Sequence, residues 1–342
     1  MLLTISKLRT DGGDMLNIHR IKVPTPYTIG SVNAYLIMSP PCTLIDPGPD
    51  TQQAREALLA GLGALGVNLA QIERVVLTHS HSDHSGLARW LAETSGARIY
   101  VHHLEVRKMT FDYDYYSERL PFMQEAGLPP DVLKEILEDF DPVVKPVLPR
   151  RGVVELTGGD VLKFAAGELK VYHLPGHSGG HICLFDEREG SFIAGDFILK
   201  HITPNPIMEA QPPDFRKRAP TLTQYLSGLD LLAGLPVRLI LPGHGGSISD
   251  CMGAVERARK HHAKRLEVVL SFLREQDLNA YQVMQALYPK IRSFLVYLGL
   301  SEALAHLDYL YAEGKVEREQ RGGVLYYRPA GNKPGVQSLA GH

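Results

Sequence analysis

The sequence predicts a mixed α/β fold in which two sheets are covered by helices on their outer faces. In both halves of residues 1–250, short apolar segments with strand character alternate with helical segments, as in sheets layered with helices. After Ser249 the hydrophobic period becomes helical. Hydrophobic residues make up 44% of the 342 residues and charged residues 22%, which is typical of a globular protein with a substantial core.

Charge and cysteine content argue against several classes of protein. The formal net charge of −2 gives no basic field for nucleic acid or an anionic membrane. Cys42, Cys183 and Cys251 are too few and too scattered for a disulfide framework, which indicates a reducing compartment. No apolar run reaches the ~18 residues of a membrane span, and the N-terminus lacks a signal-peptide core. We therefore expect a cytoplasmic protein without a membrane partner.

The first part of the chain is expected to form five strands and two helices. We expect strands at IHRIKVPTP, SVNAYLIM, CTLIDPGPD, RVVLTHS and ARIYVH, and helices over residues 51–65 and 84–94. RVVLTHS is short and almost wholly apolar, so it is expected to be central in its sheet. Residues 104–149 then change in character to aromatic, acidic and helical, and we expect them to form a lid insertion.

The second part returns to strands before it turns helical. We expect strands over residues 153–156, 161–164, 169–174, 181–185 and 191–194, a helix over 222–232, and the strand VRLILPGHG. Residues 251–330 are expected to form a small C-terminal domain, in which a connecting helix is followed by AYQVMQALY, SEALAHLDYLYAEGKV and a hairpin. This order is the outline of a winged helix. Residues 331–342 are expected to be a flexible tail.

The segment LTHSHSDHSG, residues 77–86, concentrates side chains that bind transition metals. His79 and His81 are two residues apart just past a strand. Because alternate side chains of an extended chain point the same way, both can reach one ion. Asp83 and His84 follow where the chain turns into a helix, and they are well placed for a second ion nearby. One segment can therefore serve two metals.

Each metal needs further ligands from elsewhere in the chain. Three candidates follow an apolar strand and a small residue: His177 in LPGHSGGH, Asp196 in FIAGDF and His244 in LILPGHGG. This placement puts polar side chains on the rim of a rigid sheet, where a binding site is pre-organised. Imidazoles combined with carboxylates suit divalent transition metals.

The order His-x-His-x-Asp-His, followed by His, Asp and His, resembles the metallo-β-lactamase-fold hydrolases over roughly residues 16–250. The resemblance implies a four-layer αββα sandwich with two metals. It implies that His79, His81 and His177 bind the first metal, that Asp83, His84 and His244 bind the second, and that Asp196 bridges them. Asp46 in LIDPG matches the family's structural aspartate, which supports the metal loop by hydrogen bonding.

The resemblance also implies a hydrolytic mechanism with two divalent ions, expected to be zinc, with iron or manganese as alternatives. Two cations about 3.5–4 Å apart share one water and lower its pKa towards ~7, and the bridging hydroxide attacks a carbonyl or phosphoryl centre. Asp83 can orient this hydroxide as well as bind metal. Class B1 lactamases have a cysteine at the position of Asp196, so antibiotic hydrolysis is not the expected native role.

The C-terminal segments HHAKRLEVVLSFL and HLDYLYAEGKV, together with GDFILKHITPNP, resemble the lactamase-beta-like protein 2 group. That group contains bacterial hydrolases and endoribonucleases with a C-terminal winged helix. Many winged helices bind nucleic acid through a basic third helix, but here that helix carries Glu302, Asp308 and Glu313. A packing or homodimerisation module is therefore favoured over a contact with nucleic acid.

Three functions remain open from the sequence. The favoured one is hydrolysis of a small ester, thioester or lactone, with the insertion selecting the substrate. The alternatives are a single-strand-selective endoribonuclease that uses the same metals, and a non-catalytic ligand-binding regulator. The candidate substrate-binding residues are Tyr113, Tyr115 and Tyr116 in the insertion, and Lys200 and His201 after Asp196.

Overall fold

The first six strands form one sheet in sequential order, β1-β2-β3-β4-β5-β6. The computed structural model describes residues 15–110, 113–138, 148 and 152–331. The strands of this sheet are β1 (Ile18–Val23), β2 (Val32–Ile37), β3 (Thr43–Ile45), β4 (Arg74–Val76), β5 (Arg98–His102) and β6 (Val153–Leu156). β1 to β3 pair antiparallel, and β3 to β6 are parallel. β4 is flanked by strands on both sides, as expected for its apolar sequence.

The second sheet has the order β13-β10-β9-β8-β7. Its strands are β7 (Val161–Phe164), β8 (Gly167–His173), β9 (Ile182–Asp186), β10 (Ser191–Gly195) and β13 (Leu239–Pro242). β7 to β10 pair antiparallel, whereas β10 and β13 are parallel. Because β10 and β13 run side by side in the same direction, the residues that follow them emerge at the same edge of the sheet.

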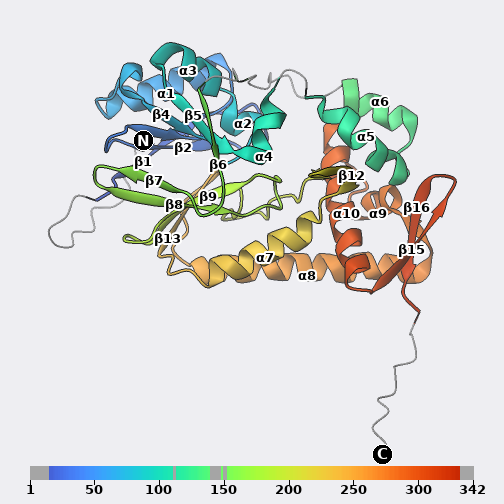
Figure 1. The fold of residues 1–342 in the computed structure, drawn as a ribbon. Helices are drawn as coiled ribbons and strands as arrows, with labels where there is room; N and C mark the ends of the chain where they lie inside the picture. The colour runs from blue at the N-terminus through green and yellow to red at the C-terminus, as the bar shows by residue number, and fades with distance from the viewer. Residues whose placement is uncertain (1–14, 111–112, 139–147, 149–151, 332–342) are drawn as a thin grey trace, which may run out of the picture.

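The two sheets pack face to face through apolar side chains, among them Tyr35 and Val76 of the first sheet and Leu184 and Ile193 of the second. α1 (Gln52–Ala64) and α3 (Ala88–Ser95) cover the outer face of the first sheet. α7 (Thr221–Ala233) and the beginning of α8 (Cys251–Glu275) cover the second. Figure 1 shows the four layers from top to bottom. The expected αββα sandwich is confirmed.

α1 shows how local sequence sets a helix in this sandwich. The Thr51 side chain caps its start by accepting a hydrogen bond from the backbone N–H of Ala54 at 3.2 Å. Leu58 and Leu62 lie one turn apart on the buried face. Gly66, with φ of 73°, ends the helix in a left-handed conformation that glycine adopts without strain. The short 3-10 helix η1 (Leu69–Gln71) then leads into β4.

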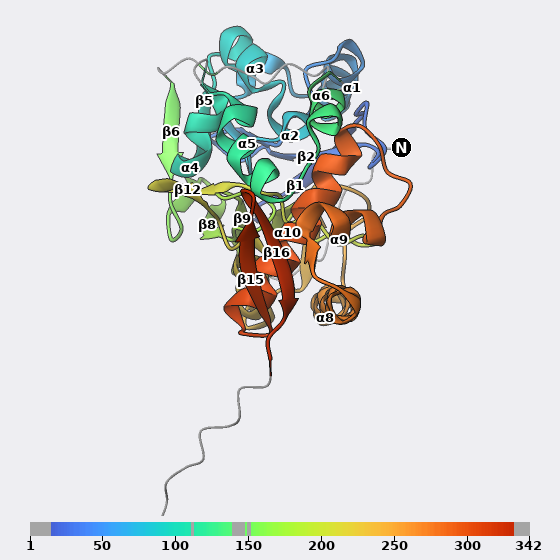
Figure 2. The ribbon, with the colours of Figure 1, turned by 90° about the vertical axis from the view of Figure 1, so that its right-hand side faces the viewer.

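The insertion packs against the C-terminal part of the chain. It contains α4 (His103–Val106), the 3-10 helix η2 (Arg107–Met109), α5 (Tyr115–Glu125) and α6 (Pro130–Glu138). Phe122 and Ile136 share one hydrophobic core with Tyr297 and Leu300 of α10 (Phe294–Ala312). Figure 2 shows α5 and α6 next to α10 at the end of the sandwich. Residues 111–112, 139–147 and 149 of the expected insertion lie outside the described residues.

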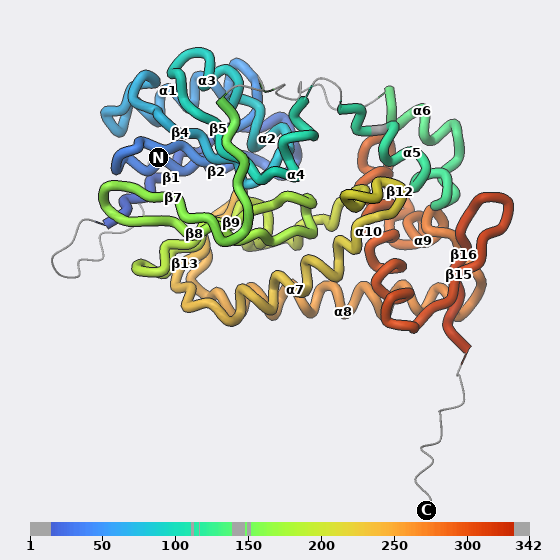
Figure 3. The backbone as a smooth tube through the Cα atoms, viewed as in Figure 1, coloured from blue at the N-terminus to red at the C-terminus, as the bar shows by residue number. Residues whose placement is uncertain are grey.

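The C-terminal part is a helical region with a small sheet. After α8 come β14 (Leu278–Asn279), α9 (Ala280–Leu287), α10, β15 (Val316–Arg321) and β16 (Val324–Pro329). The three strands form a sheet in the order β14-β16-β15. Figure 3 shows α8 running below α7 and on into this region. α8 therefore belongs to both the sandwich and the C-terminal core.

Two elements differ from the expectation. α10 begins at Phe294, well before the expected segment SEALAHLDYLYAEGKV. This start was not expected because the first turns show no polar face, and Val296, Tyr297 and Leu300 in them are buried. The hairpin of β11 (Ala210–Gln211) and β12 (Asp214–Arg218) was not expected, since its second strand is charged. The expected flexible tail is residues 331–342, and all of it except residue 331 lies outside the described residues. No helix in the described part of the chain is long and apolar enough to cross a membrane.

Candidate metal centre

The structure brings all seven candidate ligands together from the ends of four strands. The ligands are His79 and His81 after β4, Asp83 and His84 in α2 (Ser82–Ser85), His177 after β8, Asp196 directly after β10, and His244 after β13. Their ligand atoms form three overlapping groups, each with all atoms within 4.8 Å of one another: His79, His81 and His177; His79, His84 and Asp196; and Asp83, His84 and His244. The two ligand sets expected from the sequence are therefore adjacent, and they share His79, His84 and Asp196 as a link.

Glycines before two of the ligands allow this close approach. Gly195, with φ of 48°, precedes Asp196, and a Cβ at this position would lie 2.6 Å from the Thr78 hydroxyl. Gly243 precedes His244, and a Cβ there would lie 2.4 Å from Oδ1 of Asp196. Both distances are well below a van der Waals contact. The small residue before each ligand is thus required by the packing of the strand ends.

Four of the five histidines have their Nδ1–H engaged by the protein. His79 donates to the Thr78 hydroxyl at 3.0 Å and His84 to Oδ2 of Asp46 at 2.9 Å. His177 donates to the Asn205 carbonyl at 2.9 Å, and His244 to the Ser31 carbonyl at 3.0 Å. In a neutral imidazole the other ring nitrogen then carries a lone pair. All four Nε2 atoms can therefore offer a lone pair to a cation. The Nε2 of His79 makes a hydrogen bond of 3.0 Å with Nδ1 of His81, whereas those of His84, His177 and His244 have no hydrogen-bond partner.

Asp46 holds the metal loop from behind, as the sequence resemblance implies. One carboxylate oxygen accepts hydrogen bonds from the Thr78 hydroxyl at 2.7 Å and from Nδ1 of His84 at 2.9 Å. The other accepts from the Thr78 backbone N–H at 2.8 Å. Asp46 adopts a φ of 50°, which is a strained conformation for a residue with a side chain. This strain is consistent with a position that the site requires.

Asp196 lies between the two ligand sets. Its Oδ1 is 3.4 Å from Nε2 of His84, and its Oδ2 is 3.6 Å from Nε2 of His244 and 3.8 Å from Nε2 of His177. Its backbone N–H donates to Nε2 of His181 at 3.1 Å, which fixes the start of the loop. Asp196 is thus a carboxylate ligand that faces both a first-set and a second-set histidine.

The pKa values of the ligands follow from burial and from these carboxylates. Burial lowers the pKa of His81 to about 3 and that of His79 well below its usual value, and neighbouring histidines add to both effects. Burial also acts to lower the pKa of His84, but Asp196, Asp83 and Asp46 outweigh it and raise that pKa well above its ordinary value. The site therefore combines neutral imidazoles at His79 and His81 with carboxylates that favour positive charge around His84, and a bound cation would supply that charge.

Buried atoms without a hydrogen-bond partner show that this donor set fits divalent metal ions. Within the described residues, the Nε2 atoms of His84, His177 and His244 and the Oδ1 of Asp196 are buried and make no hydrogen bond. A buried polar atom without a partner is costly, and such atoms converging on one place indicate a ligand. Imidazole nitrogens and carboxylate oxygens in this arrangement are typical ligands of zinc and related metals.

Comparison with known proteins agrees with this site. Residues 27–244 match the model of the metallo-beta-lactamase superfamily. The chain belongs to this superfamily. Residues 266–330 match a second family, the metallo-beta-lactamase-like C-terminal domain, so the C-terminal region also has relatives among these proteins.

Individual relatives of this metallo-beta-lactamase superfamily member cover nearly the whole chain. It is 32% identical over 327 residues to the probable metallo-hydrolase YqjP of Bacillus subtilis (strain 168), covering 90% of this chain and 96% of that protein. It is 25% identical to the beta-lactamase-like protein 2 homolog of Drosophila melanogaster, covering 89% and 90% of the two chains. The crystal structure of a metallo-beta-lactamase family protein from Thermus thermophilus matches with a TM-score of 0.77 and 30% identity, covering 91% of this chain and 98% of that one. The full-length likeness supports a metal-dependent hydrolase.

The tyrosines expected to grip a substrate are engaged in contacts within the insertion and with α10. The Tyr113 hydroxyl accepts a hydrogen bond from Nη1 of Arg119 at 2.6 Å. The Tyr115 hydroxyl lies 2.8 Å from that of Tyr297 in α10, and its ring stacks on the Arg119 guanidinium. The Tyr116 side chain lies outside the described part of the structure. A role of these tyrosines in substrate binding remains a prediction.

Lys200 and His201 lie in the exposed loop after β10. The Lys200 side chain reaches towards the loop that carries His244. A Cβ added at Gly246 in that loop would lie 3.8 Å from Nζ of Lys200. The loop thus extends from Asp196 towards the chain that follows His244. Their expected role in binding an anionic group also remains a prediction.

Sequence reasoning did not identify the buried polar residues next to the ligands. Glu105 and Lys108, from α4 and η2, form hydrogen bonds with Ser80 and Ser178, which adjoin ligands in the sequence, and with Glu209. Charged residues in a short helix ordinarily face solvent, so the sequence carried no sign of their burial. The only available signal was a serine next to these ligands: Ser80 lies between His79 and His81, and Ser178 follows His177.

Proposed function

We propose that this protein is a dinuclear metal-dependent hydrolase that acts on a small ester, thioester or lactone. The observation that carries the proposal is the convergence of Nε2 atoms from His84, His177 and His244 on the carboxylates of Asp83 and Asp196. In each of these histidines the other ring nitrogen is engaged by a protein acceptor, so the lone pairs are pre-oriented. Zinc suits this ligand set, with iron or manganese as alternatives.

The roles of the residues follow from their positions. Divalent ions, when bound, supply Lewis acidity and lower the pKa of a water molecule. His79, His81 and His177 would hold one ion, Asp83, His84 and His244 would hold the other, and Asp196 would serve both sets. Asp83 is 15% exposed, so its carboxylate can also contact a water at the mouth of the site. It can orient this water and accept its proton.

An endoribonuclease is the weaker alternative, because three arginines on α8 are paired with carboxylates. Arg257 lies 3.3 Å from Asp250, and Arg259 contacts both Asp230 and Glu256. Arg265 lies 3.6 Å from Glu302. An RNA backbone is bound chiefly by cations that are free to pair with phosphates. A complete ligand set likewise favours catalysis over a purely regulatory binding role.

The proposal is tested with metal-loaded protein and a panel of thioester, lactone, phosphodiester and single-stranded RNA substrates. We expect turnover of a carbonyl ester, and its loss in Asp83→Ala. The matched control is Asp230→Ala, which removes an exposed carboxylate on α7 far in sequence from the ligands. Turnover of RNA alone would favour the alternative, and activity that survives Asp83→Ala would contradict the proposal.

A further inference from the structure

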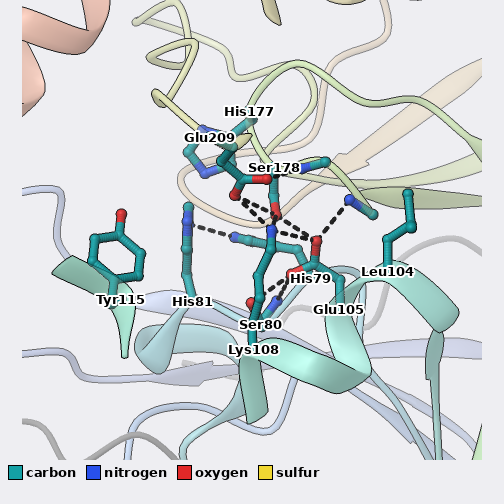
Figure 4. A network of polar contacts seen from close by, with 12 residues as sticks. His79, Ser80, His81, Leu104, Glu105, Lys108, Tyr115, His177, Ser178 and Glu209 are labelled. Atoms are coloured by element: carbon teal, nitrogen blue, oxygen red, sulfur yellow. Dashed lines mark hydrogen bonds and ion pairs between the residues drawn. The ribbon is translucent and has the colours of Figure 1, made fainter. Parts of the chain in front are cut away.

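A buried ionic network lies beside the metal centre, outside the ligand set. Its charged members are Glu105, Lys108 and Glu209, which are at most 9% exposed. The Lys108 ammonium lies between two carboxylates, 2.8 Å from Glu105 and 2.5 Å from Glu209. Figure 4 shows this lysine with its contacts, next to His79, His81 and His177. Placing three charged groups in a protein interior is costly unless each is fully paired, so the network calls for an explanation.

The Glu105 carboxylate connects the two loops that carry the first ligand set. Its Oε2 accepts from the backbone N–H of Ser80 at 3.0 Å and from the Ser80 hydroxyl at 2.5 Å. Its Oε1 accepts from the Ser178 hydroxyl at 2.6 Å and from the Gly180 N–H at 2.7 Å. Ser80 lies between His79 and His81, and Ser178 follows His177 directly. One side chain therefore sets the separation of all three ligands of the first ion.

Lys108 and Glu209 complete this brace. The Lys108 ammonium donates to Ser178 at 2.9 Å as well as to both carboxylates. Glu209 in turn accepts from the Gly179 N–H at 2.8 Å. A Cβ at Gly180 would lie 2.7 Å from the Glu105 side chain, and one at Gly179 would lie 2.7 Å from Glu209, so both glycines are needed for this approach. The His177 loop is thus held by both acids at once.

The second ligand set is held by other groups. Within the described residues, the hydrogen bonds of His84 and His244 away from the centre go to Asp46 and to the Ser31 carbonyl. The hydrogen bonds of Glu105, Lys108 and Glu209 described above reach neither of them. The Glu105, Lys108 and Glu209 network therefore contacts only the loops of the first set, whereas Asp46 supports His84 directly and His79 through Thr78.

We propose that Glu105, Lys108 and Glu209 are positioning residues that set the affinity of the first metal ion, held by His79, His81 and His177, independently of the second. This inference rests on the proposed function for the presence of two ions. The insertion, through α4 and η2, thereby controls one half of the centre. A change in the packing of the insertion against α10 is expected to be transmitted to this ion and not to its neighbour.

The test compares Lys108→Met with the wild type and with Lys134→Met, a control that removes an exposed lysine of α6. Apo protein is titrated with Zn²⁺ against a chromophoric chelator to obtain two affinities, and with Co²⁺ to follow the spectrum of each occupied set. We expect a loss of affinity of roughly 10–100-fold for one ion only, as for other groups that orient ligands. Equal weakening of both ions, or folded variant protein with both affinities unchanged, would overturn the proposal.

Lys108→Met leaves two carboxylates without their cation, so a milder second variant is included. Ser178→Ala removes one hydroxyl that donates to Glu105 and accepts from Lys108. It is expected to weaken the same ion as Lys108→Met, by a smaller factor. A drop in unfolding temperature of the apo protein without a change in either affinity would indicate a purely structural network and would also overturn the proposal. If the wild type binds two ions but hydrolyses no substrate, the proposed function fails while this inference is still decided by the affinities.

Discussion

Among the described residues, two clusters of histidines and carboxylates are close enough to hold a metal ion, and they differ in what surrounds them. The first is the metal centre, where five histidines converge on Asp83 and Asp196. The second lies between α8 and α10, where His261 and His262 come close to Glu302. Both clusters place nitrogen and oxygen atoms within reach of a single ion. Closeness of nitrogen and oxygen atoms therefore does not distinguish the two clusters, and the groups around them must.

The histidines of the second cluster bind each other, and a cationic side chain competes for its acid. Nδ1 of His306 donates to the Glu302 carbonyl at 2.7 Å, so its Nε2 accepts from Nδ1 of His262 at 3.1 Å. The Glu302 carboxylate lies 3.6 Å from Nε of Arg265. In the first cluster no arginine or lysine pairs with Asp83 or Asp196 among the described residues. In the first cluster the carboxylates of Asp83 and Asp196 are thus available to a metal cation. In the second cluster Arg265 already pairs with the carboxylate of Glu302.

The largest expected effect follows from removing the charge that links the two ligand sets. Asp196→Asn keeps the shape of the side chain but removes a carboxylate that lies within 3.8 Å of three ligand histidines. We expect loss of bound metal and a fall in hydrolytic rate on the order of 1000-fold, because the ions contribute several kcal/mol of transition-state stabilisation. Metal content is measured by elemental analysis alongside the rate.

Metal content measured in a variant of the second cluster tests whether that cluster binds an ion. His262→Gln is expected to leave the metal content per chain unchanged, since Arg265 already neutralises the acid of this cluster. A loss of one metal ion in His262→Gln would show that histidine clustering is sufficient and that the distinction drawn from Arg265 is wrong.

The next effect is a loss of stability, expected when a buried side chain in the core around α10 is shortened. Leu300 is fully buried in the core shared by the insertion, α8 and α10. Leu300→Ala is expected to lower the free energy of unfolding by about 2–5 kcal/mol, through lost burial and the cavity left behind. Urea unfolding of the apo protein measures this change. Leu231→Ala, at an exposed position of α7, is the control and should have a small effect.

The metal centre could be predicted from the sequence because its signal is local. His79, His81, Asp83 and His84 are adjacent, and His177, Asp196 and His244 each follow an apolar strand and a glycine. The strands themselves were visible because they are short apolar segments bounded by turn residues. Both features depend only on neighbouring residues, so one sequence was enough.

The features that were missed depend on contacts between distant segments. Glu105 is buried because it meets Ser80, Ser178 and Gly180, which are 25, 73 and 75 residues away along the chain. The start of α10 at Phe294 was missed for a related reason, because its first turns are apolar on every side, including the exposed Leu295, and so have no amphipathic period. Periodicity reports exposure to solvent, and it gives no information where a helix or a charge is covered by the rest of the protein.

A smaller effect is expected when the metal ligands are kept and only their support is altered. Asp46→Asn retains an oxygen for hydrogen bonding to His84 but removes the charge behind it. Such changes typically weaken metal binding by roughly 10–100-fold. We expect the loss mainly at the ion held by Asp83, His84 and His244, measured by competition with a chelator. If Lys108→Met weakened this second ion as much as Asp46→Asn does, the restriction of the Glu105, Lys108 and Glu209 network to the first ligand set would be wrong.

The smallest effect is a change in the pH dependence of stability caused by the second cluster. Burial lowers the pKa of His262 to about 3, and His306 adds to the effect while Glu302 opposes it. In the unfolded chain the pKa returns to about 6.5, so between about pH 6.5 and 3 the unfolded state binds a proton that the folded state does not. This contribution to stability is therefore complete above about pH 6.5 and is lost on acidification, by up to about 1.4 kcal/mol per pH unit. In apo protein, His262→Gln should flatten the slope of unfolding free energy against pH, whereas exposed His201→Gln should not. An unchanged slope in His262→Gln would mean that this histidine has the same pKa in the folded and the unfolded chain, so that burial between α8 and α10 does not keep it neutral.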